Sequence, residues 1–270
     1  MKIISFGISL LLTFTVMPFI KAMLFNANII RKNYKGDQIP VSMGIGFVPI
    51  VIINSIVVAF IYSDHRTKEL VLIFLTGIMT MATVGLIDDL VGNRDATGFK
   101  GHIMSLLRGK LTTGGFKAIV GGLISLFIGS MLSFNVFEIV LNTLIIALFT
   151  NLINLLDLRP GRALKGFLLI SFIFMGIGIL EEIKVIVLSS VAYAIGYFYE
   201  DMKGNTMMGD VGSNTLGVVL GISSAISFTL PIKCIILVLL IGIHLVAEKY
   251  SITEIIKKNP ILNFIDKLGC

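Results

Sequence analysis

Long apolar stretches separated by short polar segments run along the whole chain, and this pattern predicts a bundle of membrane-spanning helices. A helix needs about 20 mostly apolar residues to cross a bilayer. Nine stretches have a suitable length, and we expect a transmembrane helix in each of them. The expected spans are residues 2–24, 41–62, 69–89, 117–134, 137–156, 164–180, 183–200, 211–229 and 232–249. The pattern therefore predicts an all-α, polytopic membrane protein.

The first apolar stretch is expected to be an uncleaved membrane anchor. It is longer than the apolar part of a signal peptide, and the region near Lys21 offers no small-x-small cleavage site. We therefore count it among the nine transmembrane helices.

The last residues, 251–270, have a different pattern, in which apolar side chains are spaced between lysines. The apolar positions are Ile255, Ile256, Ile261, Phe264 and Ile265. This spacing predicts an amphipathic helix at the membrane surface, interrupted at Pro260 because proline breaks a helix interior. We expect one transmembrane domain over residues 1–250 and a separate tail over residues 251–270.

Composition supports the membrane assignment and argues against other classes. The chain is 56% hydrophobic and 14% charged, whereas soluble domains are about half apolar and a quarter charged. The two cysteines, Cys234 and Cys270, do not make a disulfide framework. The three histidines, His65, His102 and His244, are far apart in sequence, which argues against a zinc site.

The basic residues gather on one side of the predicted bundle. Segments 25–40, 90–116, 157–163, 201–210 and 250–270, with their flanking residues, hold 17 of the 22 lysines and arginines. Cytoplasmic loops carry such an excess, so we place these segments in the cytoplasm, the N-terminus outside and the C-terminus inside. The net charge of +6 is explained by this topology, and we expect no nucleic-acid partner.

Two acidic motifs fall on the predicted cytoplasmic side. Asp88 and Asp89 end the third span, and because adjacent carboxylates repel each other, a cation or a shared proton should relieve them. Asn151, Asn154 and Asp157 follow one helical face at a spacing of three residues. Their oxygen atoms suit Mg²⁺, which prefers to share its coordination with waters and substrate phosphates. Taken alone, either motif is also compatible with a helix end or an interhelical hydrogen bond.

Basic and glycine-rich segments beside these motifs indicate a phosphate site. Arg159, Arg162 and Lys165 follow Asp157 directly, and guanidinium groups bind phosphate through paired hydrogen bonds. Gly209-Asp210-Val-Gly212-Ser213-Asn214 opens the eighth span, where glycines allow close approach and a helix N-terminus favours phosphate. Asp210 would face such a phosphate as a metal ligand. The basic segment is also compatible with a topological signal alone, and Asp210 with a simple helix cap.

His244 and Glu248 lie four residues apart near the end of the ninth span. At this spacing the two side chains share a face of the helix. We expect them to hydrogen-bond each other and to contact an anionic substrate. A buried polar pair without a substrate role is the alternative.

These motifs, in this order, resemble those of the polyprenyl-phosphate N-acetylhexosamine-1-phosphate transferases, also known as glycosyltransferase family 4. The resemblance covers most of the chain, and this sequence is similar to a short, divergent member. It rests on Pro40-Val-Ser-Met43-Gly44, Gly85-Leu-Ile-Asp88-Asp89, Asn151-Leu-Ile-Asn154-Leu-Leu-Asp157, Met208-Gly209-Asp210-Val-Gly212-Ser213 and His244-x-x-x-Glu248.

The resemblance implies a phosphoglycosyltransferase of the cell membrane, with a role in cell wall biogenesis. Such an enzyme transfers a sugar-1-phosphate from a UDP-sugar to polyprenyl (undecaprenyl) phosphate at the cytoplasmic face and releases UMP, with Mg²⁺ as its cofactor. The transmembrane domain would then be catalytic, and a homodimer is compatible with the family.

The resemblance also implies roles for particular residues. Asp210 and Asn154 would bind Mg²⁺, while Asp88 or Asp89 would contact or deprotonate the lipid phosphate. The catalytic residues would then be Asp88, Asp89 and Asp210. The substrate-binding residues would be Lys100, Asn151, Asp157, Arg159, Arg162, Ser213, His244 and Glu248.

The sequence departs from the family pattern in the region expected to bind the nucleotide. Pro160 stands where the muramoyl enzymes carry an acidic residue, Gly92 where a lysine is expected, and Met207 where an aromatic residue is linked to uracil stacking. The histidine motif is reduced to His244, and a tenth span is missing. The resemblance therefore supports the reaction class more than the identity of the donor.

Three other functions stay open on the sequence alone. A catalytically silent relative that binds lipid phosphate would explain the altered nucleotide region. A lipid-linked transporter or flippase would place polar residues in the middle of the spans, whereas here they lie at span ends. Residues 157–163 are weakly similar to the CDP-alcohol phosphatidyltransferase motif, whose downstream acidic residues are missing.

Overall fold

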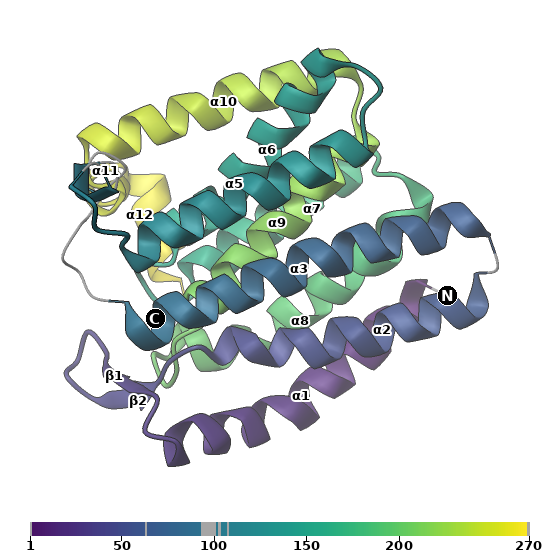
Figure 1. Cartoon of the computed structure of the whole chain (residues 1–270). Coiled ribbons are helices and arrows are strands. Elements are labelled where there is room, and N and C mark those ends of the chain that lie inside the picture. The colour runs from purple at the N-terminus through teal and green to yellow at the C-terminus, as the bar shows by residue number, and fades with distance from the viewer. Residues whose placement is uncertain (1, 63, 93–100, 102–103, 107, 269–270) are drawn as a thin grey trace.

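The computed structural model describes residues 2–62, 64–92, 101, 104–106 and 108–268. Long helices, roughly aligned with one another, form a bundle with a short β-hairpin at one end (Figure 1). The long helices are α1 (Lys2–Asn26), α2 (Phe47–Ile61), α3 (His65–Val91), α5 (Thr113–Met131), α6 (Val136–Leu156), α7 (Arg162–Ile177), α8 (Lys184–Met202), α9 (Gly209–Ser227) and α10 (Leu230–Lys249). The shorter elements are β1 (Ile30–Lys32), β2 (Gln38–Pro40), η1 (Met43–Gly46), η2 (Glu181–Ile183), α11 (Ile252–Lys258) and α12 (Pro260–Lys267).

Seven of the described helical stretches are long and apolar enough to cross a membrane. They are α1, α3, α5, α6 and α10, together with α2 extended by η1 and α8 extended by η2. The prediction of an all-α, multi-pass membrane protein is therefore confirmed. Helix α7, with 16 residues, and the glycine- and serine-rich α9 do not reach the same length and apolarity, so the count of nine spans stays a prediction.

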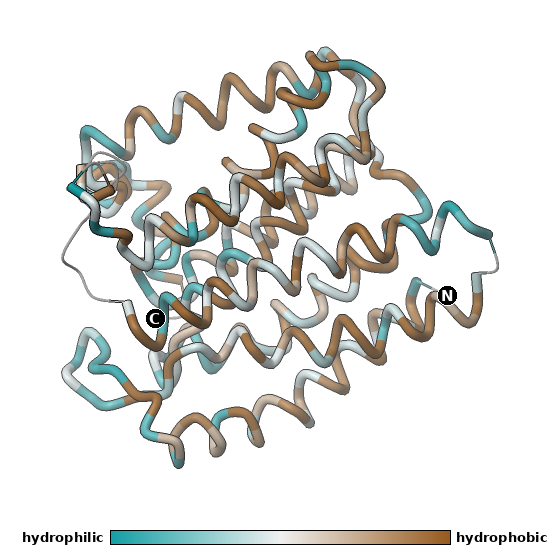
Figure 2. The backbone as a smooth tube through the Cα atoms, in the orientation of Figure 1, coloured by the Kyte–Doolittle hydropathy of each residue, from teal (hydrophilic) through white to brown (hydrophobic). Residues whose placement is uncertain are grey.

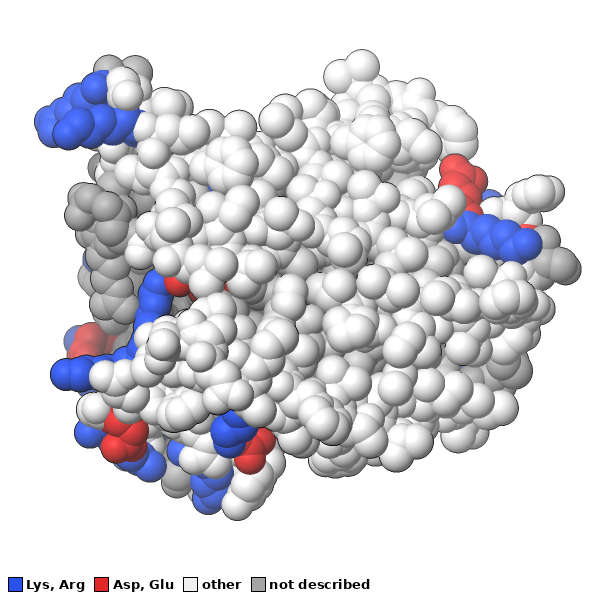
Figure 3. Space-filling view, turned by 60° about the horizontal axis from the view of Figure 1, so that its bottom comes forward, with Lys and Arg blue, Asp and Glu red and all other residues white. Residues whose placement is uncertain are grey.

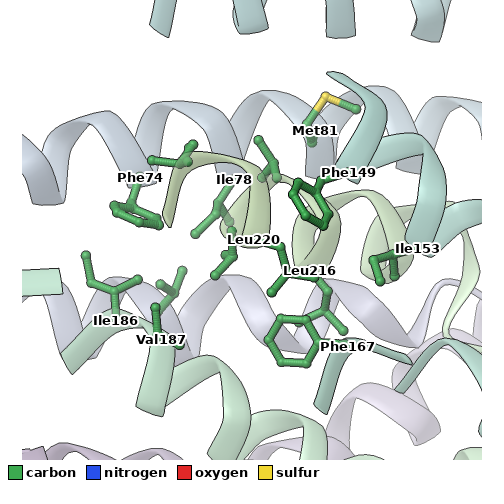
Figure 4. Packing of buried hydrophobic residues seen from close by; sticks show 14 of the residues in the cluster. Phe74, Ile78, Met81, Phe149, Ile153, Phe167, Ile186, Val187, Leu216 and Leu220 are labelled. Carbon is green, nitrogen blue, oxygen red and sulfur yellow. The ribbon is translucent and has the colours of Figure 1, made fainter. Parts of the chain in front are cut away.

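Helix α9 is the centre of the bundle. Every residue from Val211 to Ala225 is buried, and the helix packs mainly against α6 and α3. Figure 4 shows Leu216 and Leu220 of α9 among side chains of α3, α6, α7 and α8. This enclosure explains how a helix rich in glycine, serine and threonine lies inside an apolar bundle, because its neighbours shield it from lipid.

Two glycines set the contact between α9 and α6. A Cβ atom at Gly217 would lie 2.5 Å from the Cα atom of Thr150, and one at Gly221 would lie 2.6 Å from that of Ile146. The two backbones therefore touch at positions one helical turn apart, as they do in small-xxx-small packing of membrane helices. This close contact fixes the start of α9 relative to the end of α6.

The most hydrophilic residues lie mainly at the two ends of the bundle. In Figure 2 the hydrophilic colours concentrate at the hairpin end and at the connection between α2 and α3, with hydrophobic helices between them. Figure 3 shows the charged side chains of one face gathered at the same two ends, separated by a broad uncharged surface. A bilayer-spanning bundle needs this arrangement, because charged groups are costly inside lipid.

The hairpin was not expected, because strands of three residues are too short to show a sequence period. Strands β1 and β2 pair antiparallel, with Ile30 opposite Pro40. At the turn, the side-chain oxygen of Asn33 accepts hydrogen bonds from the backbone N–H groups of Lys35 and Asp37. The amide nitrogen of Asn33 donates to the carbonyl oxygen of Gly204 at 3.0 Å. This bond ties the hairpin to the segment that leads into α9.

Candidate functional site

A cavity of about 1130 Å³ opens at the hairpin end of the bundle. Its walls come from α3, α5, α6, α10, the hairpin and the start of α9. Most of the residues predicted from sequence line it, although they come from four separate helices and the turn after α6. These are Asp88, Asp89, Asn151, Asn154, Asp157, Arg159, Asp210, His244 and Glu248.

Lys117 lies at the centre of the charged part of the cavity. Its Nζ atom is 2.8 Å from Oδ2 of Asp88 and also forms an ion pair with Asp210. The three side chains are 16%, 17% and 25% exposed, so water screens them only partly. One ammonium group therefore holds together two carboxylates that would repel each other if it were absent.

The side chain of Asn154 completes this group. With its amide oriented to satisfy its neighbours, the oxygen accepts from Lys117 Nζ at 3.1 Å and the nitrogen donates to Asp210 Oδ1 at 3.0 Å. The same nitrogen lies 3.2 Å from the hydroxyl of Ser213. Ser213 is fully buried and lies behind the cavity wall, so its contact is with Asn154 and not with the cavity space.

Asp89 has a different task from its neighbour Asp88. Its carboxylate accepts hydrogen bonds from the backbone N–H groups of Asp210 at 2.9 Å and Val211 at 3.3 Å, and from the hydroxyl of Ser42 at 2.9 Å. The first N–H groups of a helix have no partner within the helix, and Asp89 supplies one from α3. It therefore fixes the start of α9, and with it the position of Asp210.

Around the bonds between Asp89 and the start of α9, backbone contacts at two glycines leave no room for a side chain. A Cβ atom at Gly85 of α3 would lie 2.6 Å from the carbonyl oxygen of Asp210. Gly44 of η1 lies against the backbone of Gly212, and its N–H donates to the carbonyl of Met208 at 2.9 Å. Three elements that are distant in sequence, α3, η1 and α9, thus meet through their backbones at Asp210 and its neighbours.

Arginine side chains and a buried acid line the part of the cavity near the hairpin. Arg31 of β1 donates to the backbone carbonyl of Asp89 at 2.5 Å, and Arg159 lies exposed on the turn after α6. Asp157, the C-cap residue of α6, lines the same cavity. Burial, together with the carboxylate of Asp201, raises the pKa of Asp157 well above its usual range. This carboxyl group is therefore placed to meet a hydrogen-bonding or cationic ligand.

Arg162 does not line the cavity, contrary to the prediction that it binds substrate. Its guanidinium donates to both carboxylate oxygens of Asp266, at 2.7 and 2.9 Å, and to the hydroxyl of Thr253 at 3.0 Å. The guanidinium group expected to bind phosphate thus binds the C-terminal tail. Lys100, another predicted phosphate ligand, lies outside the described residues, as does His102.

His244 and Glu248 both line the cavity, but the expected hydrogen bond between them is not formed. The Nδ1 atom of His244 donates to the carbonyl oxygen of Leu240 at 2.8 Å, one turn earlier in α10. Its Nε2 atom is buried and has no hydrogen-bond partner in the part of the chain that the structure describes. The ring is therefore held by its own helix through Nδ1 alone.

Sequence reasoning missed Lys117, Arg31 and Asp201 as parts of this site. The predicted span 117–134 makes Lys117 a flanking charge, whereas α5 begins at Thr113 and places this lysine about one turn inside the helix. A lysine at the start of an apolar run was the available signal. Asp201, near the end of α8, accepts from the backbone N–H of Gly161 at 2.8 Å and so shapes the turn that carries Arg159.

The oxygen donors in the cavity fit Mg²⁺ better than a softer metal. Among the described residues, no three histidine, cysteine or acidic side chains converge as a protein-only metal site. Asp210, Asp88 and Asn154 do converge, and they offer carboxylate and amide oxygens around one positive group. Mg²⁺ needs only one or two carboxylates when waters and substrate phosphates complete its shell.

Comparison with known proteins gives one family match. The model of a family described as glycosyl transferase family 4 matches residues 71–228, which is more than half of the chain. The matched region runs from α3 to the residue after α9 and contains Asp88, Lys117, Asn154 and Asp210. No curated protein matches the chain.

Proposed function

Because the chain belongs to glycosyl transferase family 4, whose members transfer sugar phosphates to lipid carriers, we propose that it acts on a UDP-sugar and a polyprenyl phosphate. In this reaction a phosphate oxygen of the lipid attacks the phosphorus atom that carries the sugar. The new bond joins the two phosphates, and the bond between that phosphorus and UMP breaks. The products are a lipid-linked sugar pyrophosphate and UMP.

The observation that carries the proposal is the group of Asp88, Lys117, Asn154 and Asp210 at the charged end of the cavity. Two phosphate groups must approach each other in this reaction, and their negative charges oppose the approach. Fixed cations and a divalent metal offset such charge in phosphoryl transfer. Lys117 supplies a fixed cation, and Arg31 and Arg159 lie in the walls of the same cavity.

The shape of the cavity supports a substrate with one charged and one apolar part. From the charged group it continues along small and apolar side chains of α5, α6 and α10, including Gly121, Ala147, Leu148, Ile241 and Leu245. An isoprenoid chain matches this lining. On the hairpin side the lining is polar, which suits a nucleotide.

In the proposed mechanism, the side chains of the cavity bind the phosphate groups, orient them and accept a proton. Lys117 binds the oxygens of the attacking phosphate, and Asp88 accepts a proton from that phosphate where it carries one. Asp89 acts as a positioning residue, because it holds the start of α9. Asp210 and Asn154 would hold Mg²⁺, which when bound neutralises charge on the pyrophosphate.

The proposal includes a topology in which all nine long helices cross the membrane. The N-terminus then lies outside, and the hairpin, the cavity and the C-terminus lie in the cytoplasm, where nucleotide-sugars are found. The excess of lysine and arginine at the hairpin end supports this orientation. The uncharged belt in Figure 3 supports a location in the membrane.

The direct test is release of UMP by the purified protein. The assay contains undecaprenyl phosphate, Mg²⁺ and a panel of UDP-sugars. The test variant is Asp210→Asn. The control variant is Glu182→Gln, because Glu182 is an acidic residue of η2 that does not line the cavity. We expect lipid-dependent UMP from at least one donor, at least about 100-fold less in Asp210→Asn, and unchanged release in Glu182→Gln.

Two results would contradict the proposal. Undiminished release by Asp210→Asn would remove this residue from the catalytic group. Absence of UMP with every donor, while undecaprenyl phosphate still raises the unfolding temperature, would identify a catalytically silent relative.

A further inference from the structure

Both helices of the C-terminal tail are attached to the start of α7 by a single arginine. Arg162, only 5% exposed, forms paired hydrogen bonds with Asp266 of α12 and a third bond with Thr253 of α11. Paired bonds between a guanidinium and a carboxylate fix orientation as well as distance. The position and orientation of the tail relative to α7 are therefore fixed by these bonds.

Lys165 adds a second attachment one turn further along α7. Its Nζ atom donates to the backbone carbonyl oxygens of Ile265, Asp266 and Leu268, each at 2.9 Å. Carbonyl groups at the end of a helix carry partial negative charge, which an ammonium group stabilises. Lys165 thus binds the C-terminal end of α12 through backbone carbonyl groups, while Arg162 binds the side chain of Asp266.

The side of the tail away from these attachments is apolar and uncovered. Ile265 and Leu268 line a shallow gap with Phe198 and Met202 of α8. In contrast, Ile261 and Phe264 on α12 are 71% and 65% exposed. Large apolar side chains exposed together on a short helix mark a surface that contacts something other than water.

The position and charge of the tail indicate what that surface contacts. Helix α11 begins at Ile252, three residues after α10 ends at Lys249, so the tail starts where a membrane-spanning helix reaches the membrane surface (Figure 1). The tail also carries Lys257, Lys258 and Lys267. An apolar helix face accompanied by lysines is the pattern of helices that lie in the interface of anionic membranes.

We propose that α11 and α12 form a two-sided element, with Arg162 and Lys165 attached to its inner side and an anionic lipid bilayer contacting its outer side. The attachment aims Ile261 and Phe264 at the acyl chains, and the lysines meet the anionic headgroups. The turn that Arg162 follows carries Asp157 and Arg159 into the cavity, so the attachment also joins the cavity wall to the membrane surface.

The test uses an environment-sensitive fluorophore on single cysteines in the full chain, reconstituted in nanodiscs. Cys234→Ala and Cys270→Ala remove the native thiols, and Ile261→Cys carries the probe. Leu239→Cys on the exposed face of α10 gives the lipid reference, and Lys35→Cys at the hairpin turn gives the water reference. Nanodiscs contain phosphatidylcholine alone or with phosphatidylglycerol, and lipid-bound or aqueous quenchers report the surroundings of the probe.

We expect the probe at position 261 to behave like the lipid reference in anionic nanodiscs and to be more accessible to water in phosphatidylcholine alone. Each of Lys257→Gln, Lys258→Gln and Lys267→Gln should lower the lipid-contacting fraction of the tail, by about fivefold when expressed as a partition ratio. These lysines lie on an exposed segment, so the variants should fold, and size-exclusion chromatography checks this.

Three outcomes would overturn the proposal. In the first, the probe at 261 is as accessible to water as the one at position 35 in both lipid mixtures. In the second, lipid contact is equal in both mixtures and unaffected by loss of the lysines, which removes the anionic preference. In the third, the probe is shielded from both quenchers, which means that a second protein surface and not lipid covers the tail.

Discussion

Lys117 determines the electrostatics of the cavity at the scale of single residues. Its ammonium group lies between Asp88 and Asp210 and also contacts Asn154, so four helices meet at one cation. Removal of one partner from a partly buried charge group leaves the others uncompensated, and this is more disruptive than the absence of the whole group. The consequences for activity and for metal binding can be separated by experiment.

For Lys117→Met we expect a loss of UMP release of about 100-fold or more, because a fixed cation near the reacting phosphates is removed. The two carboxylates then lack their counter-ion, so Mg²⁺ should raise the unfolding temperature more in this variant than in the wild-type protein. Differential scanning fluorimetry with and without Mg²⁺ measures this. An equal Mg²⁺ effect in both proteins would mean that Lys117 does not influence the proposed metal site.

Asp88 and Asp89 should behave differently despite being adjacent. Asp88→Asn is expected to lower activity, and because Lys117 keeps its ion pair with Asp210, the loss of stability should be smaller than in Asp89→Asn. Asp89→Asn weakens the bonds to the start of α9, and we expect a loss of about 1–2 kcal/mol in the free energy of unfolding, as for other helix caps. Faster hydrogen exchange at the amides of Asp210 and Val211 would report the same loss.

The matched control for Asp89 is Asp64→Asn. Asp64 also caps a helix, since its carboxylate accepts from the backbone N–H of Thr67 at 2.7 Å, but it lies at the start of α3 and away from the cavity. We expect a comparable loss of stability with activity retained. If both caps affected activity equally, the role of Asp89 would be general folding and not the placement of Asp210.

Residue types and spacing predicted most of the side chains that converge at the cavity, but they could not predict the contacts that each one makes. The three-residue spacing from Asn151 to Asp157 correctly placed these side chains at one cavity. The position of Lys117 depends on where α5 begins and which helices it packs against, and neither is encoded in a local pattern. Arg162 could not be assigned either, because its partner Asp266 lies 104 residues away.

At the scale of helices, the contact between α6 and α9 decides the geometry of the site. The end of α6 carries Asn154, the start of α9 carries Asp210, and Gly217 and Gly221 bring the two backbones together. Sequence analysis predicted both helices to within two residues of their observed ends, 137–156 against Val136–Leu156 and 211–229 against Gly209–Ser227. Their pairing could not be predicted, because it rests on contacts between segments distant in sequence.

Gly217→Ala and Gly221→Ala should therefore destabilise the protein by about 1–3 kcal/mol each, because an added methyl group forces the helices apart. Activity should fall as well, since Asn154 moves away from Asp210. Gly242→Ala in α10 is the control, because a Cβ atom there meets nothing within 4 Å. Thermal unfolding in detergent compares the three variants, and equal stability would contradict the tight contact.

Attachment of the tail to α7 should depend on pH. The hydrogen-bonded guanidinium of Arg162 lowers the pKa of Asp266. A lowered pKa in the folded state means that the attachment is fully present at neutral pH and is lost as the pH falls through the lowered pKa. The mobility of a spin label on Leu268→Cys should therefore rise at acidic pH. With Asp266→Asn, mobility should already be high at neutral pH, and an unchanged low mobility would exclude this ion pair as the attachment.

At the scale of the whole molecule, the polar segments distinguish the two ends of the bundle. The hairpin and the tail lie at one end of the bundle, and the connection between α2 and α3 lies at the other (Figures 1 and 2). Residues of the hairpin line the cavity, so the cavity belongs to the first of these ends. Composition and apolar length were enough to predict the membrane class, because they sum over many residues and tolerate local error. The short hairpin escaped prediction because it contributes little to any such sum.

A reporter fused after Cys270 should read as cytoplasmic, and one inserted between α2 and α3 should read as external. This follows from an odd number of crossings together with the excess of basic residues at the hairpin end. Paired alkaline phosphatase and fluorescent protein fusions in intact cells measure both positions. If both reporters read on the same side, an even number of helices would separate them, and α7 or α9 would not cross.

The backbone contacts of Gly85 and Gly44 also set a limit on how this protein can vary. At each position a second backbone occupies the space of a side chain, so no rearrangement of neighbouring side chains creates room. In a saturation library selected for function, we expect only glycine to survive at these two positions. The cavity-lining side chains above them should tolerate exchange, so new donor or carrier preferences can arise there while the framework beneath stays the same.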